Sequence, residues 1–110
     1  MANNPTSPTR VDANELRKIF NDQRISERGS IGELQVVVLE DRHPSLPLAQ
    51  EPYCTRSQMV SYRDGTQEIA RAHLYLRMDG SIGLSGKPDP KRVVFNGVMY
   101  SLYKKQQNTQ

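Results

Sequence analysis

The sequence predicts an α+β fold in which one N-terminal helix packs on an antiparallel β-sheet of about five to six strands, built largely from hairpins. Three features support this prediction: helix-start signals at residues 11–16, a run of branched apolar residues at 33–40, and three turn-forming dipeptides in the second half. The chain has 110 residues, enough for one domain. We expect this domain to span residues 11–104, between disordered tails at 1–10 and 105–110.

A helix is predicted over residues 12–25. Asp12 can accept a hydrogen bond at the N-cap, and Glu15 stands three residues later, as in a capping box. Gly29 offers a stop signal after the helix. A narrow apolar stripe must pack against another element, because so short a helix is not stable alone. The stripe consists of Leu16, Ile19 and Phe20.

The densest apolar segment covers residues 33–40, and all four residues at 36–39 are aliphatic. Such a continuous run is typical of a strand buried on both faces, so we expect this strand at the centre of the sheet. The following segment, residues 41–55, is predicted to be a long loop because its prolines cannot donate to a sheet ladder. These prolines are Pro44, Pro47 and Pro52.

The second half of the chain is predicted to form an antiparallel meander. Its turns are expected at dipeptides that tolerate the positive φ angles of tight hairpins, namely Asp64-Gly65, Asp79-Gly80 and Asn96-Gly97. The strands are expected at residues 57–63, 66–78, 81–85, 91–95 and 98–103. Asp89 and Pro90 suggest an alternative for the last hairpin, a short helix over residues 91–95, because proline is favoured in the first turn of a helix.

The charge is distributed unevenly along the chain. The formal net charge is +3, but residues 1–55 hold six Lys and Arg against eight Asp and Glu, whereas residues 56–110 hold nine against four. The basic character therefore belongs to the predicted hairpins. An excess of cations on one part of a domain favours a polyanionic partner.

The predicted strand 66–78 alternates between an apolar face and a cationic face. The apolar face holds Ala70, Ala72, Leu74, Leu76 and Met78, and the other holds Ile69, Arg71, His73, Tyr75 and Arg77. Cations beside an aromatic ring suit phosphates and a stacked base. A two-residue turn at Asp64-Gly65 would also place Arg56 opposite His73. The alternative is a structural face, on which the arginine stems pack flat and their charged heads reach water.

A second cationic segment covers residues 85–91. It does not complete a phosphate-binding P-loop, because Pro88 follows Lys87 and the preceding glycine is misplaced by one residue. Gly86 with its neighbouring amides is a candidate anion-binding nest, supported by Lys87, Lys91 and Arg92. The alternative is a stiff connection in which the prolines fix the backbone.

The composition argues against several classes of protein. The longest aliphatic run has four residues, whereas a membrane span needs about 20. Cys54 is the single cysteine, and together with two histidines it is too little for the usual zinc site. We therefore expect a soluble cytoplasmic protein with no cofactor, no metal and no membrane partner.

These patterns favour a small cytoplasmic binding module that contacts nucleic acid, RNA or DNA, mainly at the sugar–phosphate backbone of the nucleic acid. The candidate residues are Arg56, Arg71, His73, Tyr75, Arg77, Lys87, Lys91 and Arg92. An alternative is a protein-interaction or regulatory module that uses a sheet edge or the proline-rich loop, where Pro44 and Pro47 have PxxP spacing. A third is a small metal-independent ribonuclease with His73 as acid or base. The spacing pairs no carboxylate with His73, which favours binding over catalysis.

Overall fold

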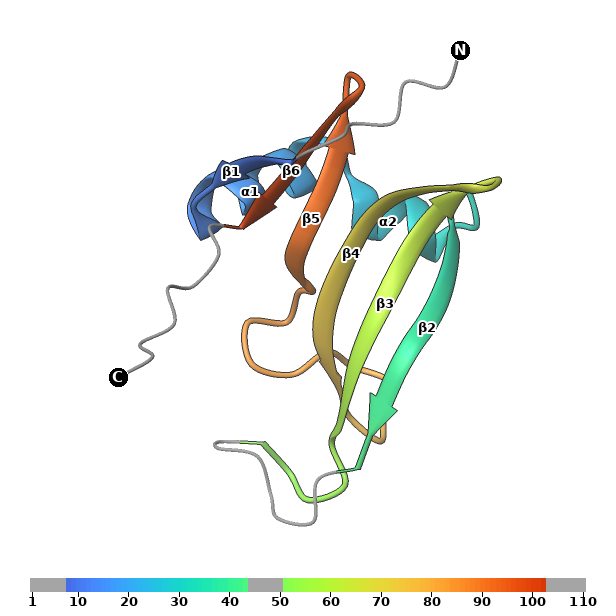
Figure 1. Ribbon diagram of the computed structural model, residues 1–110. Helices are drawn as coiled ribbons and strands as arrows, with labels where there is room; N and C mark the ends of the chain where they lie inside the picture. Colours follow the sequence, from blue (N-terminus) through green and yellow to red (C-terminus); the bar gives the residue numbers. More distant parts are fainter. Residues whose placement is uncertain (1–7, 44–50, 103–110) are drawn as a thin grey trace.

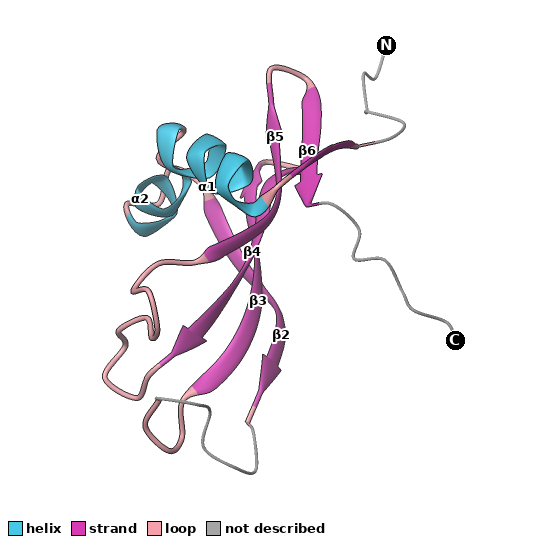
Figure 2. Ribbon diagram, turned by 90° about the vertical axis from the view of Figure 1, so that its left-hand side faces the viewer, coloured by secondary structure: helices cyan, strands magenta, loops and turns pink. Residues whose placement is uncertain are grey.

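The chain forms two layers, a six-stranded sheet and two helices that cover one face of it (Figure 2). The computed structural model describes residues 8–43 and 51–102 (Figure 1). Its elements are β1 (Thr9–Val11), α1 (Ala13–Asp22), α2 (Ile25–Ser30), β2 (Gln35–Arg42), β3 (Arg56–Asp64), β4 (Gln67–Leu76), β5 (Asp89–Phe95) and β6 (Val98–Leu102). The strand order is β1-β6-β5-β4-β3-β2; β1 is parallel to β6, and the other described pairs are antiparallel. The predicted α+β fold, with an N-terminal helix on an antiparallel sheet, is confirmed.

The predicted helix start is confirmed, but α1 ends at Asp22, before the predicted end at residue 25, and Gly29 is not the stop signal. The Asp12 side chain accepts a hydrogen bond from the Glu15 amide at 2.8 Å. Arg24 then adopts a left-handed conformation, with φ of 53°, which ends α1 and turns the chain into α2. Gly29 lies inside α2, where a Cβ atom would be 2.9 Å from Val36 Cγ2. Its lack of a side chain therefore permits the close approach of α2 to β2.

The core lies between the helices and the apolar face of the sheet. Ala70 and Ala72 on β4 are fully buried, and their small side chains let α1 lie close to the strands. Phe20 of α1 packs edge-on against Tyr62 of β3, with ring centroids 5.7 Å apart. The buried apolar residues are Leu16, Phe20, Ile25, Leu34, Val60, Tyr62, Ala70, Ala72 and Val93.

The prediction that residues 33–40 form a central strand is wrong. Most of this segment belongs to β2, which lies at the edge of the sheet and, among the described strands, pairs with β3 alone. Val36, Val38 and Leu39 are 43%, 49% and 43% exposed. The physical reason is that α1 and α2, with 10 and 6 residues, do not cover the full width of the sheet.

Two of the three predicted turns close hairpins, but one has a shifted register. Asn96-Gly97 forms the predicted turn, with both φ angles positive and Phe95 opposite Val98. The first turn instead has Gly65 and Thr66 at its centre, because Asp64 pairs with Gln67, and a bulge follows beyond Tyr62. The predicted pairing of Arg56 with His73 is therefore wrong. Arg56 lies opposite Leu76, and His73 lies opposite Met59.

The predicted strand 81–85 does not form. A single bridge joins Leu76 to Ile82, and residues 83–88 then follow an irregular path to β5. The helix suggested as an alternative over residues 91–95 is wrong too, because β5 begins at Asp89 and buried Pro90 pairs with Ala72 beside a bulge. β4 thus continues with β3 beyond the point where β5 begins (Figure 1).

Several predictions concern residues outside the described ranges. These are residues 1–7 of the first expected tail, all of the second, and residues 44–50 of the predicted proline-rich loop, including Pro44 and Pro47. Two residues of the expected first tail, Thr9 and Arg10, belong to β1, and Arg10 Nη1 donates to Ser101 Oγ and to the Leu102 carbonyl at 3.2 Å each. Neither described helix has the length and apolar character that a bilayer span requires.

Candidate functional site

The cationic face of β4 lies on the side of the sheet away from the helices. Ala70 and Ala72 point into the core, so the alternating residues Arg71, His73 and Tyr75 point the other way, and each is half-buried. Arg77 lies one residue beyond the end of β4, in the turn that follows. The eight predicted site residues therefore divide into groups with different surroundings.

Arg71 and Arg92 form one group around Glu68. The two arginines lie opposite each other on β4 and β5, and their Nε atoms donate to the Glu68 carboxylate at 3.1 and 2.8 Å. Fully buried Ser61 donates to the same carboxylate at 2.5 Å. Burial alone would raise the pKa of Glu68, but the hydrogen bonds from Ser61, Arg92 and Arg71 hold it below its usual value. The negative charge keeps the two arginines together on one face.

Glu68 was not among the sequence-predicted site residues. In a regular strand, residues three apart point to opposite faces, so the sequence gives no sign that Glu68 meets Arg71. The bulge between the Tyr62–Ala70 and Arg63–Glu68 pairs adds one residue to β4. The alternation of side chains between the two faces is therefore interrupted, and Glu68 lies beside Arg71.

Arg56 and Arg77 are also paired with carboxylates of the chain. Arg56 binds Asp41 on the neighbouring strand β2. Arg77 makes a two-pronged contact with Glu51, at 2.9 and 3.1 Å, and the Glu51 side chain is only 1% exposed. The hydrogen bond from Arg77 holds the pKa of Glu51 below its usual value. Both arginines therefore fasten segments of the chain together.

The candidate nest near Gly86 already receives an anion from within the chain. The Leu84 amide donates to the Glu51 carboxylate at 2.7 Å, and Leu84 has a positive φ of 55°. The Gly86 amide donates to the Gly83 carbonyl at 3.1 Å. These amides are consequently committed to internal bonds, and the contribution of this segment to a ligand site comes from its side chains.

His73 and Tyr75 form a pair on β4 at the point where this strand extends beyond the start of β5. Their rings meet edge-on, with centroids 4.7 Å apart, and Ser57 Oγ lies 2.7 Å from His73 Nε2. Burial lowers the pKa of His73 below 6.5, and the positive charge of Lys91 lowers it further against the opposing effect of Asp89. The pKa shift therefore favours the neutral form of His73 in the free protein.

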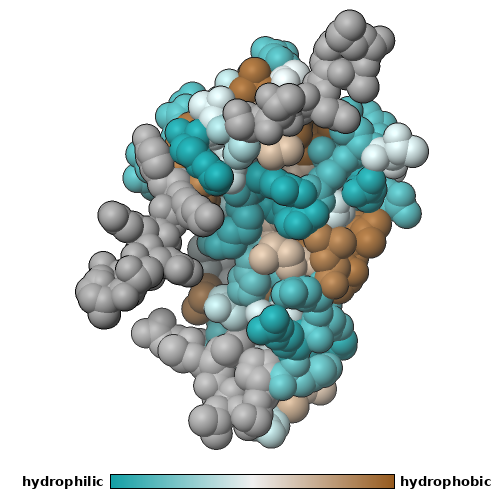
Figure 3. Space-filling model, in the orientation of Figure 1, coloured by the Kyte–Doolittle hydropathy of each residue, from teal (hydrophilic) through white to brown (hydrophobic). Residues whose placement is uncertain are grey.

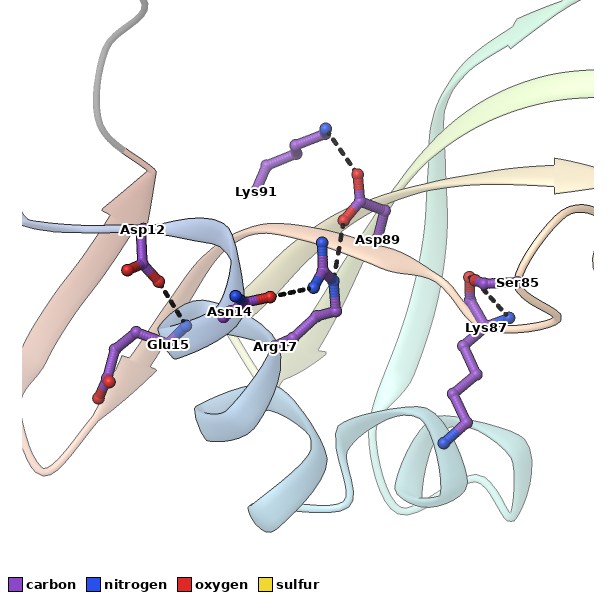
Figure 4. A network of polar contacts seen from close by, with 8 residues as sticks. All are labelled: Asp12, Asn14, Glu15, Arg17, Ser85, Lys87, Asp89 and Lys91. Carbon is purple, nitrogen blue, oxygen red and sulfur yellow. Dashed lines mark hydrogen bonds and ion pairs between the residues drawn. The ribbon is translucent and has the colours of Figure 1, made fainter.

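These two rings line a pocket of about 860 Å³ between α1, β4, the start of β5 and residues 83–88. Three cations surround it, Lys87, Lys91 and Arg17, of which the sequence had predicted the two lysines. Asp89 lies among them, 3.9 Å from Arg17 Nε and 3.1 Å from Lys91 Nζ (Figure 4). Asn14 accepts from Arg17 at 2.8 Å and so helps to hold the guanidinium in place.

Lys87 is the most available cation of this pocket. It is exposed, makes no ion pair within residues 8–43 and 51–102, and its side chain extends along the helices away from Asp89 (Figure 4). A second pocket of about 590 Å³, between α1 and α2, shares Asn21, Lys87 and Pro88 with the first. Lys87 therefore lies where two hollows meet.

The described residues provide neither a metal cluster nor a complete hydrolytic triad. No group of three or more His, Cys, Asp or Glu side chains occurs within residues 8–43 and 51–102. Ser57 and His73 are hydrogen-bonded, but Asp89 is bound to Lys91 and faces Arg17. Among the described contacts, His73 thus has no carboxylate that would orient it as a base.

No family model, curated protein or solved structure matches this chain.

Proposed function

We propose that this protein binds single-stranded nucleic acid, RNA or DNA, in the pocket between α1, β4, β5 and residues 83–88. The observation that supports the proposal is the convergence of three cations, Arg17, Lys87 and Lys91, with the rings of His73 and Tyr75. Proteins that hold single strands combine cations for the phosphates with aromatic rings on which a base stacks. Both kinds of group occur here within one hollow.

The size and charge of the pocket favour an unpaired nucleotide. A volume of about 860 Å³ lies in the range of small-ligand sites, and a base enters a concave site of this kind only when it is free of its own stack. Three cations and one carboxylate leave the lining with a net positive charge. Tyr75 and Met59 supply apolar contact for a base, while Lys87 and Arg17 provide positive charge for its phosphates.

The pocket also supports the proposal better than the wider cationic face does. The four arginines among the sequence-predicted site residues are each bound to a carboxylate, so their charge is already balanced within the chain; they are Arg56, Arg71, Arg77 and Arg92. A polyanion would have to displace those carboxylates. Lys87 requires no such exchange.

The test is the affinity for a labelled single-stranded oligonucleotide of about ten nucleotides, measured by fluorescence anisotropy at about 50 and about 200 mM salt. Lys87→Glu should weaken binding by about tenfold and reduce its salt dependence, because a phosphate contact is lost. Lys18→Glu is the matched control: it makes the same charge change on α1, at a 72% exposed side chain outside the pocket.

Equal losses of affinity in the two variants would show a diffuse electrostatic attraction to the whole surface and would overturn the pocket as the binding site. Absence of binding at the lower salt concentration would overturn nucleic-acid binding itself. The length of an RNA probe after incubation separates binding from cleavage: an intact strand is expected. Breakdown that His73→Ala abolishes would instead favour the ribonuclease alternative.

A further inference from the structure

β2 presents a long edge of the sheet that pairs with no second strand within residues 8–43 and 51–102. It has eight residues, Gln35–Arg42, and β3 is its one partner among the described strands, so every second residue directs its amide and carbonyl away from the sheet. The opposite edge is β1, which has three residues. Proteins commonly protect long edges with charge or proline, but residues 35–39 contain neither.

The same edge is hydrophobic. Val36, Val38 and Leu39 are each more than two-fifths exposed. Figure 3 shows hydrophobic surface gathered on the side of the molecule where Figure 1 places β2. Open backbone groups beside exposed aliphatic side chains are what another strand requires in order to pair.

We propose that two copies of this chain associate through their β2 strands, which pair antiparallel about a two-fold axis at Val37 and extend one sheet into the next. In this register Val37 faces its own counterpart, and Val36 faces Val38 of the other copy. Such an interface is self-complementary, because the same residues serve both sides. The regular part of the strand suffices for this register, since the bulge in β2 comes after Val38.

The helices favour this arrangement. Val36 and Val38 pair with the core residues Tyr62 and Val60, so both point to the helix-covered face. α2 approaches the sheet at Val36, through Gly29, and Val36 and Val38 remain 43% and 49% exposed. In the antiparallel pair, Val38 of one copy lies beside Val36 of the other and next to that copy's α2. Each copy would thus cover the apolar residue that the other leaves exposed.

The charges at the ends of β2 are already balanced. Glu33 is bound to Arg28 at 2.7 Å, and Asp41 is bound to Arg56. The register brings Glu33 of one copy near Asp41 of the other, where two free carboxylates would repel each other. Because each carboxylate has an arginine of its own chain, the acidic ends do not oppose association.

The first experiment measures the oligomeric state by analytical ultracentrifugation, from about 1 µM to about 1 mM protein. We expect a monomer–dimer equilibrium that Val38→Lys shifts to monomer, because a buried charge would face Val36 of the other copy. Ile31→Lys is the control: Ile31 is 76% exposed and lies outside β2, so this variant should dimerise like the natural chain. A monomer at every concentration would overturn the proposal.

The second experiment tests the register and does not depend on the lysine variants folding. In a Cys54→Ser background, Val37→Cys should form a covalent dimer under mild oxidation, because facing residues of an antiparallel pair lie within disulfide range. Gln35→Cys is the control, since the two copies of residue 35 would be about 13 Å apart along the strands. Equal cross-linking at positions 35 and 37 would contradict the register.

Discussion

The cations predicted for the site differ in whether they are already paired with a carboxylate. Arg56, Arg71, Arg77 and Arg92 all bind carboxylates of the chain itself, which suits the planar guanidinium and its paired donors. Lys91 is bound to Asp89, whereas Lys87 is exposed and makes no ion pair within residues 8–43 and 51–102, so Lys87 is the most free to meet a ligand. The charge that composition assigns to the second half is therefore available at only a few of its residues.

Glu68→Gln should destabilise the fold by about 2 kcal/mol, because it leaves Arg71 and Arg92 opposite each other without their shared anion. Urea unfolding followed by circular dichroism measures the change. Glu27→Gln is the control, and it should cost less than about 0.5 kcal/mol, since Glu27 is exposed and only 3.8 Å from Arg24.

The same variant gives a prediction for acid stability. The pKa of Glu68 is below 4.5 in the folded chain, so its stabilising effect is present above pH 4.5 and is lost as the pH falls through the folded-state value. The free energy of unfolding of the natural chain should fall more steeply below pH 4.5 than that of Glu68→Gln. Parallel pH profiles would contradict the role given to this carboxylate.

His73 predicts a pH dependence of binding. Its pKa lies below 6.5 because of burial and the charge of Lys91, while Asp89 acts in the opposite direction. A bound phosphate favours the protonated ring, so affinity for the oligonucleotide should rise as the pH falls from about 7 to about 5. His73→Phe should remove that rise. An unchanged pH dependence in this variant would show that His73 does not face the ligand.

Among the elements, residues 83–88 have the largest influence on the pocket although they form neither helix nor strand. The Glu51 carboxylate holds this segment through the Leu84 amide and is itself held by Arg77. Gly83 packs directly against that carboxylate, so a Cβ atom there would collide with it. The position of Lys87 thus depends on a contact with a residue 36 positions earlier in the sequence.

Gly83→Ala should destabilise the chain by about 1 to 3 kcal/mol and speed hydrogen exchange at the Leu84 amide, because the new methyl group displaces the Glu51 carboxylate. The control is a double-mutant cycle with Glu51→Ala. Without the carboxylate the same methyl group meets no obstacle, so the cost of Gly83→Ala should largely disappear. Additive costs would argue against the contact.

Elements that depend on local signals were predicted well from the sequence. The capping pattern at Asp12 and the turn at Asn96 and Gly97 require only neighbouring residues, and both occur. β2 shows the limit of such signals. Its aliphatic run predicts burial, but burial depends on which strands pair beside it and on how far two short helices extend.

At the scale of the whole molecule, the pocket lies where β4 continues beyond the start of β5. β4 pairs with β5 only from Ala70 to His73, and it continues alone with β3 toward Leu76. The sequence allowed four of the lining residues to be proposed as cationic or aromatic candidates: Lys87, Lys91, His73 and Tyr75. Their meeting with Arg17 could not be proposed, because it depends on where α1 lies on the sheet and on two bulges that no local pattern indicates.

The pairing of β1 with β6 has a consequence for how the chain folds during synthesis. Arg10 and Ser101 are neighbours in the sheet but 91 residues apart in sequence. α1 is made before β5, on which it packs, so this contact cannot form until the intervening strands have been synthesised. This high separation of contacts predicts slow folding, with β1 docking among the last steps.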